Sequence, residues 1–115
     1  MSENRPRVFI TGAAVISPLG NELETFWTRL IAGESGAGPI TRFDTTQYDT
    51  KFGCEVKDFS FEPVLDRKEA KRADLYARYA MAASVQAVKD AGLENDLAGT
   101  DPDRVPLECR ISKGG

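Results

Sequence analysis

The chain contains no histidine among its 115 residues. On this chain alone, that absence excludes mechanisms that need an imidazole base, an imidazole zinc ligand, or a Ser-His or Cys-His pair. The two cysteines, Cys54 and Cys109, have no partners at metal-ligand spacing, so we expect no metal or cofactor. They could pair with each other, but nothing in the sequence indicates an oxidising compartment, so two free thiols are expected.

Long apolar runs are absent as well. No stretch approaches the roughly 18 apolar residues that a spanning helix needs, and the N-terminal MSENRPR lacks the apolar core of a secretory signal. The formal net charge of -3 argues against binding nucleic acid over the whole chain, so any basic patch must be local. The composition, 41% hydrophobic and 29% charged, is that of one soluble domain, for which we expect the cytoplasm.

The first third of the chain predicts a strand, a loop and a helix. Arg7 to Thr11, RVFIT, is a short run with β-branched and aromatic residues, typical of a buried strand. Its following turn lacks the closely spaced glycines of a dinucleotide site, so nucleotide binding is not favoured. The stretch ELETFWTRLIAG predicts a helix, because its apolar residues recur on one helix face at Leu23, Phe26, Trp27, Leu30 and Ile31. Asn21 or a neighbour could cap its start, and Gly33 could end it.

The middle of the chain is less regular. Residues 34–50 are rich in Gly, Ser, Thr and Asp and predict a long loop. Residues 52–56, with Phe59 and Phe61, indicate either a short strand or a turn whose aromatic side chains anchor an irregular segment.

Asp66 to Gly92 predicts one long helix, with Asp66 as a candidate N-cap and Gly92 as a left-handed C-terminal cap. From Tyr79 onward this helix is rich in alanine, which permits close contact with other backbone. Its first turns are basic, with Arg67, Lys68, Lys71 and Arg72. Two interpretations of the basic turns stay open: a surface that attracts an acidic partner, or a solvated face offset by Asp66, Glu69 and Asp74.

Several of these blocks occur together and in order: RVFITGAAVISPLGN, FDT, FGCEVKDF, DRKEAKRAD and the alanine-rich helix ending in DAGL. In this combination the chain resembles, from about Arg7 to Val105, the start of the β-ketoacyl-acyl carrier protein synthase II family. Related polyketide ketosynthases and chain-length factors share parts of the pattern, which leaves the fatty-acid or polyketide pathway open.

The resemblance implies an α/β fold, the N-terminal part of a thiolase-like layered αβαβα fold, which we expect to be incomplete over residues 1–115. It also implies decarboxylative condensation of an acyl thioester with malonyl-acyl carrier protein. The family's nucleophilic cysteine and two histidines lie downstream of this segment, so no catalytic residue is assigned here. Cys54 is in the wrong block to be that nucleophile, and we expect it to be a small, partly buried residue.

The resemblance further implies that Lys68, Lys71 and Arg72, with Arg67 adjacent, contact the acidic recognition helix of acyl carrier protein. The intact family forms homodimers, with no nucleic acid or membrane partner. Two alternatives from other classes remain: a non-catalytic module that binds acyl carrier protein, and a relative of the chain-length factors.

After Val105 the chain departs from the family pattern. Residues 106–113, PLECRISK, place a proline and several charges where the family has an apolar strand. We expect an incomplete or frameshifted reading frame, with a genuine short protein as the rival. With little to cover the alanine-rich helix, we also expect exposed apolar area and poor solubility.

Overall fold

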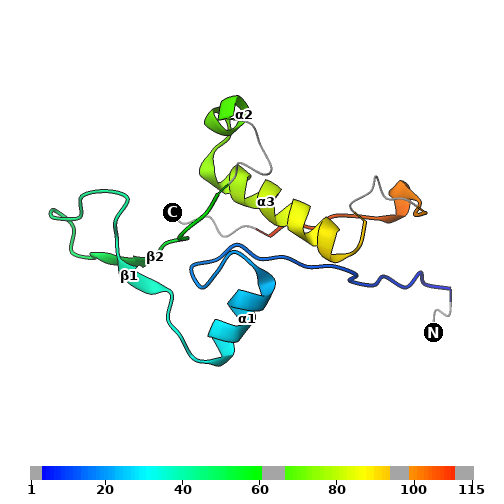
Figure 1. Cartoon of the computed structure of the whole chain (residues 1–115), viewed down its shortest axis with the longest axis horizontal. Coiled ribbons are helices and arrows are strands. Elements are labelled where there is room, and N and C mark those ends of the chain that lie inside the picture. Colours follow the sequence, from blue (N-terminus) through cyan, green and yellow to red (C-terminus); the bar gives the residue numbers. More distant parts are fainter. Residues whose placement is uncertain (1–3, 61–66, 94–98, 111–115) are drawn as a thin grey trace.

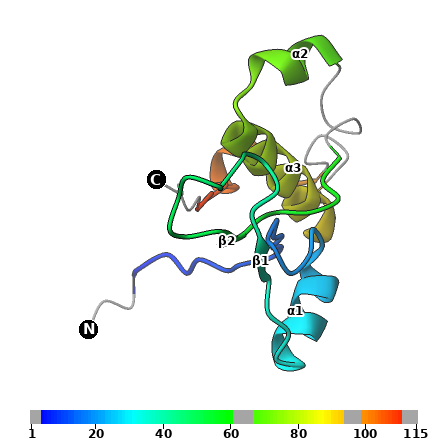
Figure 2. The same cartoon turned by 90° about the vertical axis from the view of Figure 1, so that its left-hand side faces the viewer.

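The computed structural model describes residues 4–60, 67–93 and 99–110. In chain order its elements are α1 (Leu23–Ile31), β1 (Ala37–Pro39), β2 (Phe52–Cys54), α2 (Arg67–Arg72), α3 (Leu75–Asp90) and a 3-10 helix, η1 (Pro102–Arg104). α3 runs through the middle of the molecule, and α1 and α2 lie on opposite sides of it in both views (Figures 1 and 2). Within the described ranges, no helix has the length and apolar character needed to cross a membrane.

The helix predicted after residue 21 is confirmed as α1. Its N-cap is Glu22, which makes no capping hydrogen bond through its side chain, and the Asn21 amide instead donates to the Lys57 carbonyl at 2.8 Å. At the other end, Gly33 has a φ of 75°, the left-handed conformation that ends a helix and that glycine adopts without strain. The pattern therefore located this helix correctly, and its N-cap is the neighbour of Asn21 rather than Asn21 itself.

β1 and β2 form an antiparallel hairpin with Gly38 opposite Gly53. Of the two alternatives for residues 52–56, the structure has the short strand, over Phe52–Cys54. β1 lies inside the segment predicted to be a loop, because its sequence, AGP, has none of the β-branched or aromatic residues that indicate strands. Phe59 packs edge-on against Tyr79 of α3, with ring centroids 4.7 Å apart, so it anchors the segment after the hairpin. Phe61 lies outside the described residues.

The strand predicted at Arg7 to Thr11 is wrong for this structure. The segment is extended, but no neighbouring strand pairs with it in the described part of the chain, and a strand without a partner leaves its backbone groups to water. Its apolar side chains are also uncovered: Val8 is 82% exposed, Phe9 68% and Ile10 92%.

The single helix predicted from Asp66 to Gly92 is two helices. α2 ends at Arg72 and α3 begins at Leu75, with Asp74 in extended conformation (φ −62°, ψ 156°) as the N-cap of α3. Aspartate is a weak residue for a helix interior, which favours a break here, although the Asp74 side chain makes no capping hydrogen bond. Gly92, with a φ of 74°, ends α3 as predicted, whereas Asp66 lies outside the described residues.

The N-terminal segment crosses the last turns of α3 at Gly12. A Cβ atom on Gly12 would lie 2.4 Å from the Ala87 carbonyl oxygen and 2.7 Å from the Ala91 Cβ, so only glycine fits this crossing. The next amide, that of Ala13, donates to the Asp90 carboxylate at 3.0 Å. The small residues of α3 therefore do permit close approach, as the sequence predicts.

The described residues build very little core. Ala82 of α3, 4% exposed, is the one buried apolar side chain among them, whereas many large apolar side chains, including several on α3, are exposed. The expected exposure of apolar area is confirmed. After η1, residues 106–110 form no strand, and Arg110 pairs with Glu108 at 2.8 Å on the surface.

Candidate functional site

The predicted basic residues lie on α2. Lys68, Lys71 and Arg72 are all exposed, and at about 100° per residue they share one face of the helix, an arc of roughly 100°. In the described part of the chain, none of the three forms an ion pair. Arg67 begins the helix, but its side chain lies outside the described part. We call Lys68, Lys71 and Arg72 the α2 basic face.

The break between α2 and α3 places the basic face on a short helix of its own. The Arg78 guanidinium of α3 donates to the Ala73 carbonyl at 3.0 Å, which satisfies a backbone acceptor beside the end of α2. α2 stands at an end of the molecule in both views (Figures 1 and 2). The geometry therefore presents three exposed cations on a short helix, an arrangement suited to an acidic partner.

A second polar cluster joins the hairpin region to α3 close to this break. The Arg42 guanidinium donates to the Tyr79 hydroxyl at 2.9 Å and to the Val56 carbonyl at 3.1 Å. Because these contacts join residues 37 and 14 positions apart, no local sequence pattern could have indicated them. They join the hairpin region, which precedes α2 in the chain, to α3, which follows it.

Glu55 fixes the other side of this cluster. Its carboxylate accepts the Thr41 hydroxyl at 2.8 Å and the Thr41 amide at 3.0 Å. These two hydrogen bonds, the hydroxyl contact first, lower the pKa of Glu55 below its ordinary value of 4.5 because they favour the charged form. A similar contact from Thr46 lowers the pKa of Asp44 below 3.8.

The Glu55 cluster gives a pH-dependent prediction. Since the folded pKa lies below the unfolded one, this contact stabilises the fold fully above about pH 4.5 and is lost as the pH falls through the lowered folded value. In an NMR titration, we expect the Glu55 carboxyl and the Thr41 amide to share a midpoint below 4.5. Thr41→Val should raise that midpoint toward 4.5, whereas the control Thr46→Val should move only Asp44. A Glu55 midpoint at or above 4.5 in the unaltered chain would contradict this assignment.

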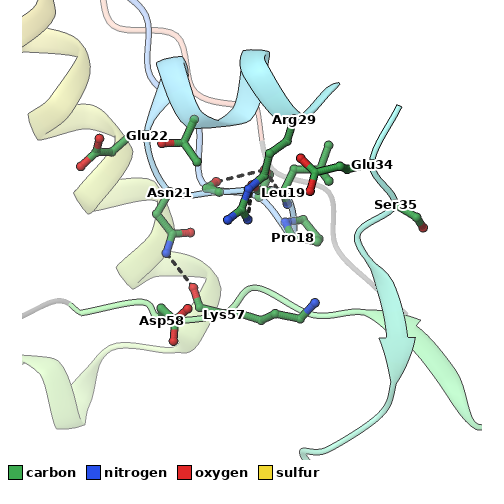
Figure 3. Close-up of a pocket in the computed structure, with 12 residues that line it drawn as sticks. Pro18, Leu19, Asn21, Glu22, Arg29, Glu34, Ser35, Lys57 and Asp58 are labelled. Carbon is green, nitrogen blue, oxygen red and sulfur yellow. Dashed lines mark hydrogen bonds between the residues drawn. The ribbon is translucent and has the colours of Figure 1, made fainter. Parts of the chain in front are cut away.

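A hollow of about 400 Å³ lies beside the loop that precedes α1 (Figure 3). Arg29 reaches into it and donates to the Leu19 carbonyl at 3.0 Å, and Asn21 spans to Lys57 across it. The buried Asn21 Oδ1 has no hydrogen-bond partner. Lining residues are Ser17, Pro18, Leu19, Gly20, Asn21, Glu22, Thr25, Arg29, Glu34, Ser35, Lys57 and Asp58.

This hollow shows no nucleophilic machinery. The Ser17 hydroxyl donates to the Gly20 carbonyl and accepts the Leu19 amide, so it stabilises the turn rather than facing a base. Both cysteines are free, as predicted, but Cys54 is exposed rather than partly buried, because β2 is covered only by its hairpin partner. Within residues 4–60, 67–93 and 99–110, no group of three potential metal ligands occurs.

The sequence itself identifies the class of protein. Residues 5–105 match the family described as "Beta-ketoacyl synthase, N-terminal domain", so the chain belongs to the β-ketoacyl synthase family. Its α/β structure is the N-terminal part of that family's thiolase-like fold, in agreement with the fold class predicted from sequence.

Within the family, the chain is similar to proteins named 3-oxoacyl-[acyl-carrier-protein] synthase 2. It is 49% identical to that of Synechocystis sp. (strain ATCC 27184 / PCC 6803 / Kazusa) over 77% of this chain and 21% of the relative. It is 47% identical to that of Coxiella burnetii (strain RSA 493 / Nine Mile phase I) over 95% of this chain and 26% of the relative. It is 42% identical to that of Staphylococcus aureus (strain N315) over 100% of this chain and 27% of the relative.

A solved structure shares the conformation. "The ishigamide ketosynthase/chain length factor" superposes with a TM-score of 0.70 and 41% identity, over 78% of this chain and 22% of that one. The chain thus spans about a quarter of the length of the relatives that it matches.

Proposed function

We propose that this chain is the N-terminal segment of a 3-oxoacyl-acyl carrier protein synthase, whose whole performs decarboxylative condensation of an acyl thioester with malonyl-acyl carrier protein. The observation that carries the proposal is the similarity of 42–49% identity to three proteins of that name, spread over most of the chain. The completed protein would be a cytoplasmic homodimer, as the family resemblance implies.

The segment is inactive by itself under this proposal. The family resemblance implies that two histidines support decarboxylation and stabilise the developing oxyanion, and this chain has no histidine. Neither of its cysteines lies beside a base, because the required imidazole is missing. A condensation assay on the 115-residue chain with malonyl- and acyl-carrier protein is therefore expected to give no turnover.

The role proposed for this segment is recognition of acyl carrier protein through the α2 basic face. Three exposed cations on one face produce a local positive potential in a chain whose net charge is -3. Such a patch steers an acidic partner into encounter and disfavours basic ones. Of the acidic residues nearby, Glu69 lies about 60° from Arg72 around α2 and Asp74 lies beyond the end of the helix, so they offset part of the charge while the three cations stay exposed.

Charge reversal on α2 tests this role. The double change Lys68→Glu and Arg72→Glu should weaken binding of holo-acyl carrier protein by about tenfold or more at low salt. The loss should shrink at 1 M salt, where the Debye length is only about 3 Å. Binding can be followed by NMR titration of labelled carrier protein against the 115-residue chain.

The matched control is the double change Lys51→Glu and Lys57→Glu, which alters the net charge equally at two exposed lysines away from α2. It should leave carrier binding nearly unchanged at both salt concentrations. If the two double variants weaken binding equally, net charge rather than the α2 basic face governs the encounter, and the proposed docking role fails.

Two alternatives have their own tests. The superposition on a protein described as a ketosynthase/chain length factor favours a chain-length-factor relative as the second candidate. That candidate predicts that the completed protein lacks the nucleophilic cysteine. A non-catalytic carrier-binding module predicts carrier binding by the chain in the test above and no condensation by any completed form.

A further inference from the structure

The whole chain exposes far more surface than its mass predicts. Its accessible surface is 9801 Å², whereas a compact monomer of 12.6 kDa exposes about 6,200 Å², so the excess is about 3,600 Å². Its radius of gyration, 17.7 Å, likewise exceeds the ~13 Å expected for a compact domain of this length. An excess of this size is on the scale of permanent interfaces, which bury about 2,000–5,000 Å².

The most regular part of the exposed apolar surface lies on α1. Leu23, Trp27, Leu30 and Ile31 fall within an arc of about 100° of this helix, and their exposed fractions are 42%, 58%, 45% and 66%. We call these four residues the α1 stripe. A soluble helix with such a stripe packs it against another element.

A second exposed region is the segment Val8–Ile10. It is extended, its apolar side chains are 68–92% exposed, and its backbone pairs with no strand in the described ranges. Extended backbone of this kind is a template for strand addition by another polypeptide. This segment and α1 diverge from each other in both views (Figures 1 and 2), so one flat contact with a second copy does not cover both.

The solved relative indicates what covers these surfaces. It superposes on 78% of this chain with a TM-score of 0.70, and the match covers only 22% of its own length. A similar conformation therefore occurs in a protein with more than three times as much additional polypeptide. Polypeptide of that length is large enough to cover the exposed area.

We propose that the α1 stripe and Val8–Ile10 form a docking surface for a polypeptide corresponding to the remaining three-quarters of a β-ketoacyl synthase, and that these contacts hold without a peptide bond between the two parts. The inference rests on the proposed function. It adds that the interface is strong enough for the two parts to act as separate chains.

The test is a protein made from residues 1–105 of this chain, a protease site, and the downstream three-quarters of the Coxiella burnetii relative. After purification and cleavage, gel filtration should show both pieces in one particle. Separation of the two pieces on cleavage would overturn the proposal.

The Trp27→Glu variant tests the α1 stripe itself, with Thr28→Glu as the matched control at the adjacent exposed position. The two pieces of the Trp27→Glu protein should separate on cleavage, or this variant should fail to yield soluble protein. The Thr28→Glu protein should behave as the parent. Parent-like association of Trp27→Glu, or equal failure of both variants, would contradict a role for the stripe.

Condensation activity, measured before and after cleavage, keeps this proposal distinct from the proposed function. Association of the cleaved pieces without any condensation supports docking and contradicts the proposed function. Condensation by the uncut protein followed by separation on cleavage supports the proposed function and overturns docking.

Discussion

Replacing Gly12 by alanine is expected to detach the N-terminal segment from the end of α3. The added Cβ would meet the Ala87 carbonyl oxygen at 2.4 Å, a distance that real Cβ atoms essentially never show. The other atoms that it would meet are the Cβ and the backbone nitrogen of Ala91, both at 2.7 Å. Because helix backbone and an alanine Cβ cannot rotate away, the N-terminal segment must move. Overpacking of this kind destabilises a fold by about 1–3 kcal/mol.

The hydrogen bond from the Ala13 amide to Asp90 reports this loss. We expect hydrogen exchange at the Ala13 amide to become about 5- to 150-fold faster, which corresponds to about 1–3 kcal/mol. The matched control is Gly38→Ala in β1, where a Cβ meets nothing within 4 Å, and it should leave Ala13 unchanged. Unaltered exchange at Ala13 in Gly12→Ala would show that the crossing is not close in solution.

Local signals predicted the parts of the fold that depend on local interactions. The apolar spacing of α1 and the glycines that end α1 and α3 each act within a few residues, so they appear in the sequence directly. The strand at Arg7 to Thr11 fails because a strand requires a partner, and partners are a property of the whole fold. The break at Asp74 was missed although aspartate favours N-caps, because the surrounding helix formers dominate the pattern.

The candidate site likewise combines residues that local spacing predicts with contacts that depend on the whole fold. Spacing on one helix face placed Lys68, Lys71 and Arg72 together, and the structure has them exposed on α2. Their role in carrier binding remains a prediction that rests on family resemblance and charge. The contact from Arg42 to Tyr79 joins residues 37 positions apart, so it depends on how the hairpin meets α3.

We propose that this chain contributes one necessary part of a condensing enzyme. Joining residues 1–105 to the downstream three-quarters of the Coxiella burnetii relative supplies the nucleophilic cysteine and histidines that the family resemblance implies. The chain covers the matching N-terminal quarter of that relative at 47% identity, so the joined protein should fold as one enzyme. An otherwise identical joined protein with the downstream nucleophilic cysteine replaced by alanine is the control.

Condensation of acyl- and malonyl-acyl carrier protein by these proteins is the most direct measurement. We expect turnover by the joined protein, and background rates for both the cysteine variant and the 115-residue chain. Turnover by the 115-residue chain alone, or a folded joined protein that binds acyl carrier protein without condensing it, would contradict this proposal.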